Sequence, residues 1–169
     1  ITTESKVNFA SPTAVDISDS ITASNASAIA QTNNITAIFS GGVADTIANL
    51  TSSSSIAADL AAITNDDTDV NITVTDDANT SVKATELSSI GDATTGKVTV
   101  SNAIDINGTS AELIAALVTD STKVIASIAN LTISDTPTSA QLSALDALTT
   151  GIIKFPPGNV NKFVIPATS

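Results

Sequence analysis

LSALDALTTG, from Leu142 to Gly151, is the stretch that decides the fold, because weaker copies of it occur upstream. The copy LSSIGDATTG, from Leu87 to Gly96, keeps the apolar positions and the Thr-Thr-Gly end. A third copy, IAALVTDSTK from Ile114 to Lys123, lies between them at steps of 27 and 28 residues. Leu60 and Ile63 continue the series one step further back. A fixed period in this range is typical of solenoids and repeat arrays.

Each copy predicts a short helix. Apolar residues at positions i and i+3 form one stripe on a helix, and a closing glycine favours a helix end because it tolerates the left-handed conformation. Thr109 with Glu112, and Thr138 with Gln141, fit the capping box, in which the two side chains satisfy each other's backbone N–H groups. Helices of about ten residues are unstable alone, so packing must hold them in place.

Apolar strands recur between the predicted helices with the same period. They are Val70–Val74, Val98–Val100 and Ile125–Ile128, and Ile152–Phe155 occupies the same slot after the last helix. A second apolar pair follows each of the inner strands, as in Ile104 with Ile106 and Leu131 with Ile133. The inferred unit is therefore strand, tight turn, second strand, helix and turn.

The spacing of strands and helices favours a straight stack of such units. Neighbouring strands lie about 4.8 Å apart and packed helices lie about 8–10 Å apart. Two neighbouring strands of one sheet therefore have about the same width as one helix. The predicted fold class is α/β: an αβ-solenoid of strand-strand-helix coils of 27–28 residues, shaped as a straight prism. The alternative is a curved solenoid like that of leucine-rich repeats, with one strand per helix.

The length of 169 residues suits a single solenoid domain. The parts expected along it are an N-terminal cap at 1–13, degenerate repeats at 14–53, regular repeats at 54–155 and a C-terminal cap at 156–169. The degenerate part predicts strands at 15–18 and 35–39 and a helix at 24–32, while 43–50 fits either a strand or a helical turn. The C-terminal cap holds one apolar strand, Phe163–Ile165.

The ALDALTTG-type motif resembles tandem repeats of very large secreted or surface proteins of bacteria, cyanobacteria among them. The predicted coil also resembles the triangular αβ-prism solenoid known as the Toblerone fold. The resemblance covers roughly residues 54–155 and is clearest at 84–100 and 109–155. It implies an extracellular repeat module and brings no catalytic residues with it.

The composition excludes several classes of function. The net charge of −11 argues against a nucleic-acid partner, since neutralising phosphates needs a basic surface. The chain contains neither histidine nor cysteine, which removes Ser-His-Asp triads, imidazole metal sites and thiol nucleophiles. No apolar run approaches the ~20 residues of a membrane helix. The acidic, Cys-free chain, which starts at Ile1, is expected to be a mature or excised fragment of a secreted bacterial protein.

Carboxylates cluster in one segment of the sequence. Oxygen-rich side chains on turns are the ligands that Ca²⁺ prefers, but the EF-hand pattern is absent, and a charge run is often merely solvated. The main expectation is therefore that the protein has no cofactor, and the alternative is that it binds Ca²⁺. The candidate ligands are Asp66, Asp67, Asp69, Asp76 and Asp77.

Stacked coils would also align hydroxyl groups at the helix ends. Thr94-Thr95, Ser121-Thr122 and Thr149-Thr150 would then form a ladder. Regular threonine arrays can bind ice, whereas Ser and Thr at turns usually serve to satisfy backbone groups. Ice binding is therefore one hypothesis for this chain.

The sequence favours a non-catalytic structural repeat module, a spacer or display segment of a secreted or cell-surface protein, over an enzyme. The alternative is an adhesin-like module that binds Ca²⁺ or a surface ligand. Self-association through exposed sheet edges or end caps is possible in such an architecture, and the sequence does not identify a ligand.

Overall fold

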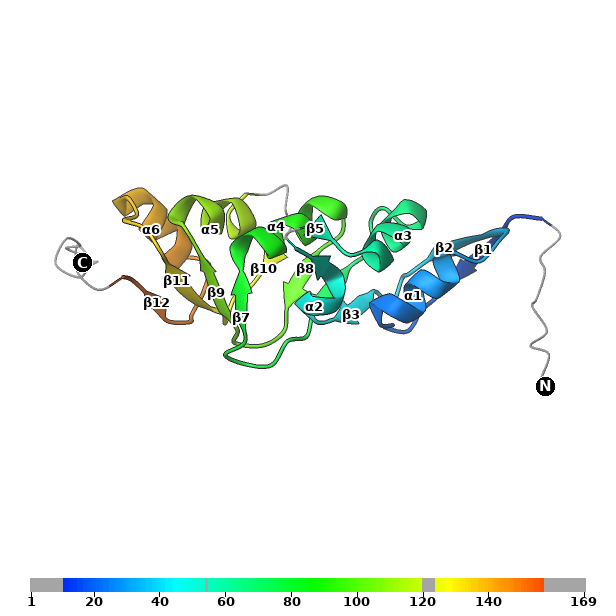
Figure 1. Ribbon diagram of the computed structural model, residues 1–169, viewed down its shortest axis with the longest axis horizontal. Helices are drawn as coiled ribbons and strands as arrows, with labels where there is room; N and C mark the ends of the chain where they lie inside the picture. Colours follow the sequence, from blue (N-terminus) through cyan, green and yellow to red (C-terminus); the bar gives the residue numbers. More distant parts are fainter. Residues whose placement is uncertain (1–10, 54, 120–123, 157–169) are drawn as a thin grey trace.

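The computed structural model describes residues 11–53, 55–119 and 124–156 as an elongated α/β structure with parallel sheets (Figure 1). Its helices are α1 (Ala23–Ala30), α2 (Ile47–Leu50), α3 (Ala58–Asp66), α4 (Ala84–Ala93), α5 (Ser110–Leu117) and α6 (Ser139–Asp146). Its strands are β1 (Thr13–Asp16), β2 (Ile35–Ile38), β3 (Val43–Asp45), β4 (Thr51–Ser52), β5 (Ser55–Ile56), β6 (Ile72–Val74), β7 (Ser81–Lys83), β8 (Val98–Val100), β9 (Asp105–Gly108), β10 (Val124–Ile125), β11 (Asn130–Ile133) and β12 (Ile153–Lys154).

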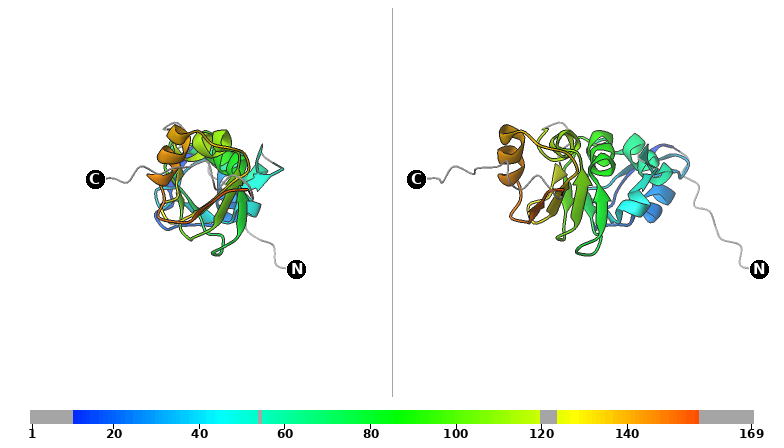
Figure 2. Two further views of the ribbon diagram at one scale, coloured as in Figure 1. Left: turned by 90° about the vertical axis from the view of Figure 1, so that its left-hand side faces the viewer. Right: turned by 60° about the vertical axis from the view of Figure 1, so that its left-hand side comes forward.

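Two four-stranded parallel sheets form the body of the molecule. The first sheet has the order β3-β6-β8-β10, and the second sheet has the order β7-β9-β11-β12. From β6 to β11 the chain visits the first sheet, then the second sheet, then a helix, and repeats this path. In the end-on view the elements surround a common axis (Figure 2).

Buried apolar residues stand opposite one another in both sheets. In the first sheet Val43, Ile72, Val98 and Val124 are paired in register, and each is at most 7% exposed. In the second sheet the corresponding row is Val82, Ile106, Leu131 and Ile153; the first three are buried and Ile153 is half-buried. Such rows fix the register, because a slip of one residue would turn every apolar side chain outward.

The structure corrects the expected sheet arrangement. The two strands of one unit enter two different sheets, so each sheet gains one strand per unit. The prediction that each unit adds two strands to one sheet was wrong. The spacing argument for a straight prism depended on that arrangement and therefore no longer applies. The period also differs from 27–28 residues, since Ile72 pairs with Val98 and Ile106 pairs with Leu131.

The helices bury most of the predicted stripe positions, but the stripes of α5 and α6 differ from the expectation. Leu60, Ile63, Leu87 and Ile90 are fully buried, as expected. In α5, however, Leu113 and Ala116 are fully buried, while Ile114 is half-buried and Leu117 is 8% exposed. Leu145 is fully buried in α6, whereas Leu148 beyond the helix is 38% exposed.

Both predicted capping boxes are confirmed. The Thr109 hydroxyl accepts from the Glu112 N–H at 3.2 Å, and the Glu112 carboxylate accepts from the Thr109 N–H at 2.8 Å. Thr138 and Gln141 repeat these contacts at 3.2 and 2.8 Å. At α4 only half of the motif is possible: the Glu86 carboxylate accepts from the Lys83 N–H at 2.9 Å, but a lysine side chain has no acceptor to return.

The closing glycines serve a purpose other than the expected one. Gly96 and Gly151 do not adopt positive φ, although Gly42 does. A Cβ on Gly96 would lie 2.3 Å from the Asp69 carbonyl oxygen, and one on Gly151 would lie 2.1 Å from the Ala129 carbonyl oxygen. Glycine is needed there because the two backbones touch.

The N-terminal part holds more elements than the sequence suggested. β1 pairs in parallel with β2, and α1 packs against α3. Residues 43–50, which fitted either a strand or a helical turn, contain both, because β3 is followed closely by the single turn of α2. The antiparallel hairpin β4-β5 then adds residues before α3, so the step from Val43 to its partner Ile72 is longer than the others.

The last predicted strand lies in a different sheet from the expected one. Ile153 and Lys154 pair with Leu131 and Thr132 of the second sheet, whereas Ile152–Phe155 was expected in the slot of Val98–Val100. The predicted strand Ile125–Ile128 is also shorter, because β10 ends at Ile125. The N-terminal cap is described only from Ser11, and the C-terminal cap beyond Pro156 lies outside the described residues.

Candidate functional site

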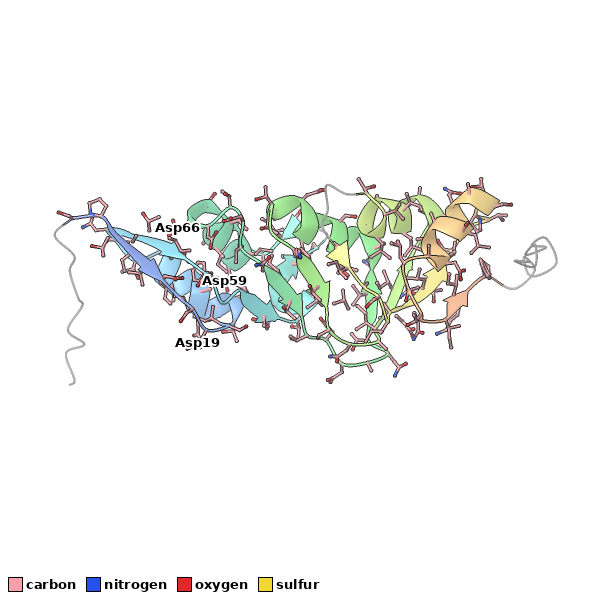
Figure 3. The ribbon with its side chains drawn as sticks, turned by 180° about the vertical axis from the view of Figure 1, so that it is seen from behind. Asp19, Asp59 and Asp66 are labelled. Carbon is pink, nitrogen blue, oxygen red and sulfur yellow. The ribbon has the colours of Figure 1, made fainter. Side chains whose placement is uncertain are left out.

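Asp66 and Asp67, the first two candidate calcium ligands, lie at the end of α3 beside β2. Figure 3 shows Asp66 at this end of the helix. The Asp66 carboxylate accepts from the Ala37 N–H at 3.0 Å, and the Asp67 carboxylate accepts from the Phe39 N–H at 2.6 Å. β2 has a strand partner on its other side only, within the described part of the chain. The two carboxylates therefore take the place of a third strand along this edge.

Asp67 is the buried member of this pair, at 7% exposure. Burial raises the pKa of its carboxyl group above the usual 3.8, and a hydrogen bond with the Asp69 side chain acts in the same direction. The hydrogen bond from the Phe39 N–H opposes this shift, because it favours the charged carboxylate.

Asp76 takes part in a different contact, which occurs three times among the described residues. Its carboxylate accepts from the N–H of Ile47, the first residue of α2, at 2.7 Å. Asp45 contacts Ala23 at the start of α1 at 3.0 Å, and Asp135 contacts Ser110 at the start of α5 at 2.7 Å. In each case the aspartate comes from a later turn of the chain and satisfies a backbone donor that the helix leaves unpaired.

Strand register places these three aspartates. Val74 stands opposite Asp45, so Asp76 falls opposite Ile47. Ile133 stands opposite Gly108, so Asp135 falls opposite Ser110 in the same way. A short pattern, Val or Ile two residues before Asp, marks all three sites: Val43-Ala-Asp45, Val74-Thr-Asp76 and Ile133-Ser-Asp135. Our sequence reasoning missed it because the partner lies 22 to 29 residues away.

The five candidate ligands are not gathered into one site. In the described ranges, no group of three or more acidic residues is placed to hold a metal ion. Asp66, Asp67 and Asp76 each accept a backbone N–H, Asp69 lies beside Asp67, and Asp77 is exposed. Calcium binding by these residues stays a prediction.

The threonines of the Thr-Thr-Gly motifs use their hydroxyl groups internally. Thr94 donates to the Val70 carbonyl at 2.7 Å, and Thr149 donates to the Ala129 carbonyl at 2.6 Å. Val70 precedes a strand of the first sheet and Ala129 precedes a strand of the second sheet, so the two motifs do not form one ladder. Ser121 and Thr122 lie outside the described residues.

An apolar hollow of about 100 Å³ opens near the C-terminal end of the first sheet. Ile125 on β10 is 45% exposed, and Leu148, just after α6, is 38% exposed. This feature could not be predicted from the sequence, because the repeats place both residues at predicted core or strand positions. The hollow is lined by Leu117, Val124, Ile125, Ala126, Leu148 and Thr149.

Comparisons with protein-family models, curated proteins and solved structures found no match for the chain. The described residues include no helix that is long and apolar enough to span a membrane. The conclusions about function therefore depend on the chain's own geometry.

Proposed function

We propose that this chain is a non-catalytic structural repeat module, a spacer or display segment of a secreted or cell-surface protein. The observation that carries the proposal is the unbroken parallel pairing from β3 to β10 and from β7 to β12. Such pairing couples each unit to the next through backbone hydrogen bonds and buried rows, so the described body can transmit shape and load along its length.

The proposed architecture is a solenoid of strand-strand-helix units. Each sheet gains about 4.8 Å per unit, while packed helices need about 8–10 Å. In Figure 1 the helices α4, α5 and α6 follow one another along one side of the strands β7, β9 and β11. This mismatch supports the curved, leucine-rich-repeat-like alternative over a straight prism.

The way polar groups are used also supports a structural role. In the described part of the chain, every buried side-chain nitrogen or oxygen has a hydrogen-bond partner. The carboxylates of Asp45, Asp76 and Asp135 are engaged in capping helices. Groups held in this way stabilise the stacking of units, which is what a spacer requires.

The other hypotheses remain distinct from this proposal. An adhesin-like module would bind Ca²⁺ or a surface ligand through the acidic segment from Asp66 to Asp77, and an ice-binding protein would need free hydroxyl arrays. The strong negative charge still argues against a nucleic-acid partner.

Distance measurements between spin labels test the spacer proposal. Because the chain has no cysteine, labels can be attached to Asn33→Cys, just before β2, and Ser143→Cys, on α6, both at exposed positions. A rigid spacer gives one narrow distance distribution, and the same pair in denaturant gives a broad control. A broad or multiple distribution for the folded protein would reject the proposal.

A further inference from the structure

The chain contains seven Asn-X-Ser/Thr sequons, the acceptor pattern for N-linked glycans. A pattern this short also occurs by chance in a chain rich in Asn, Ser and Thr, so the sequence alone does not choose among them. A glycan is bulky and is attached to the side-chain nitrogen of the asparagine, so it fits best where the fold does not need that amide. The seven asparagines are Asn25, Asn34, Asn49, Asn71, Asn79, Asn107 and Asn130.

Two of these asparagines donate from the nitrogen that would carry the glycan. Nδ2 of Asn49 donates to the Asp45 carboxylate at 2.6 Å. Nδ2 of Asn107 donates to the Ser81 hydroxyl at 2.9 Å. A glycan on either nitrogen would disturb a contact that joins two parts of the fold.

Three further sequons are also occupied by the fold. The amide oxygens of Asn71 and Asn130 accept backbone N–H groups from the next turn of the chain, both at 2.9 Å. Asn25 lies within α1, and the hydroxyl residue of its sequon, Ser27, is 1% exposed. These side chains become accessible to an enzyme only when the structure opens locally.

The other two asparagines, Asn34 and Asn79, stand at exposed turn positions with positive φ, 62° and 66°. Asparagine adopts this conformation more readily than most residues. The two sequons differ in the residue two positions before the asparagine, which is Thr32 for Asn34 and Asp77 for Asn79. Asp77 is exposed, so it offers a negative charge beside the acceptor that a basic group of a transferase can bind.

Backbone hydrogen bonds hold the turn that carries Asn79. The Thr80 N–H donates to the Asp77 carbonyl at 3.0 Å, and the Asn79 N–H donates to the Ala103 carbonyl at 2.9 Å. These bonds leave the side chains of Asp77 and Asn79 exposed. Ser81, the hydroxyl residue of the sequon, is exposed at the start of β7.

We propose that Asn79 is an N-glycosylation site that accepts a sugar from a lipid diphosphate-linked oligosaccharide. In the transfer, Nδ2 forms a bond to the anomeric carbon of the sugar, and the bond from that carbon to the diphosphate oxygen breaks. The lipid diphosphate leaves with the electron pair, and one amide proton is released to solvent. The inference rests on the proposed secreted or cell-surface role, because sequons are modified in secreted proteins.

Glycosylation of the purified full chain in vitro tests the proposal. The folded protein is incubated with a bacterial oligosaccharyltransferase and a lipid diphosphate-linked oligosaccharide, and mass spectrometry of peptides measures the occupancy of each sequon. We expect the glycan at Asn79. Occupancy at the five sequons that the fold uses should be lower by about tenfold or more, because those sites require local opening.

Variants of the two exposed turns locate the site. Asn79→Asp should abolish the modification, since aspartate tolerates the same turn conformation but has no amide nitrogen. The matched control is Asn34→Asp, at the other exposed turn with positive φ, which should leave the modification unchanged. Ser81→Ala keeps Asn79 and removes the hydroxyl group, and it should cause the same loss as Asn79→Asp.

Three outcomes overturn the proposal: a folded chain that stays unmodified, a glycan that persists in Asn79→Asp, and equal occupancy at Asn34. Because the enzyme and the donor are supplied in the tube, the result does not depend on where the protein resides in the cell. Failure of the proposed function is distinguished by the spin-label measurement, which gives a broad distance distribution in that case whether or not Asn79 carries a glycan.

Discussion

At the scale of single residues, carboxylates replace backbone partners that the chain does not supply. Asp66 and Asp67 complete the edge of β2, and Asp45, Asp76 and Asp135 complete helix starts. An unsatisfied buried backbone group costs about 1–3 kcal/mol, so these contacts explain why a strongly acidic chain places aspartates next to its core.

Asp67→Asn should raise the melting temperature at neutral pH. Because the pKa of Asp67 is raised in the folded state, the folded protein binds a proton there more tightly than the unfolded chain does. The contribution of Asp67 to the free energy of unfolding therefore falls as the pH rises from below 3.8 through the folded pKa. An asparagine still accepts from the Phe39 N–H and carries no charge to desolvate.

Thermal unfolding from about pH 3 to pH 7 measures this effect. Asp92→Asn, at an exposed position, controls for the removal of one negative charge. We expect the melting temperature at neutral pH to rise more for Asp67→Asn than for Asp92→Asn. An equal or smaller rise for Asp67→Asn would contradict the expectation.

Gly96→Ala should destabilise the protein by about 1–3 kcal/mol, the usual cost of overpacking. Its Cβ would lie 2.3 Å from the Asp69 carbonyl oxygen and 2.4 Å from the Val70 carbonyl oxygen, and both atoms belong to the backbone. Denaturant unfolding measures the change. Lys97→Ala, at the exposed neighbouring position, should leave the stability nearly unchanged, and an equal loss in both variants would show that the clash is relieved.

At the scale of helices and strands, stability comes from neighbours rather than from local sequence. The helices contain four to ten residues, lengths that are marginal in isolation. Their stripes pack against the two sheets, and later turns of the chain cap some of their first N–H groups. An element therefore fails when the contact with its neighbour is removed, even if its own sequence is intact.

Asp76→Ala should lower the free energy of unfolding by about 1.5–3 kcal/mol, the range for hydrogen bonds to charged groups. The variant leaves the N–H of Ile47 at the start of α2 without its partner. Asp77→Ala is the matched control, because Asp77 is adjacent but exposed. Urea denaturation compares the two variants, and equal losses would argue against the capping role.

Leu145→Ala should cost about 2–5 kcal/mol, because Leu145 is fully buried in α6. Leu148→Ala, in the same motif but at 38% exposure, should cost clearly less. The free energy of unfolding measures both changes. A cost below about 1 kcal/mol for Leu145→Ala would show that α6 does not contribute to the core in the way described.

At the scale of the whole molecule, we expect the proposed spacer to be stable without a metal ion. We expect the melting temperature to stay unchanged when millimolar Ca²⁺ is added after chelation, with cooperative unfolding in both conditions. A ligand that binds only the folded state must raise the melting temperature. A large upward shift would favour the adhesin-like alternative and the Asp66–Asp77 segment as its site.

Local sequence determined much of the secondary structure. The i, i+3 stripes located α3, α4 and α6, the capping boxes marked the starts of α5 and α6, and alternation found β6, β8, β9 and β11. These signals are read from neighbouring residues, so no knowledge of distant contacts was needed. The one-residue shift in α5 was missed because Ile114 and Leu113 are equally apolar, and only packing chooses between them.

Tertiary structure alone decided the rest. Whether two strands of a unit share one sheet or enter two depends on how the turn between them bends, and no spacing in the sequence encodes that angle. The partners of Asp45, Asp76 and Asp135 depend on register across 22 to 29 residues. The place of β12 depends on where the preceding residues Thr149-Thr150-Gly151 pack. Gly151 lies in close contact with the Ala129 backbone, and this contact sets the position of the strand that follows. The sequence by itself determined most of the helices and strands, because their signals are local, and long-range pairing determined what each of them contacts.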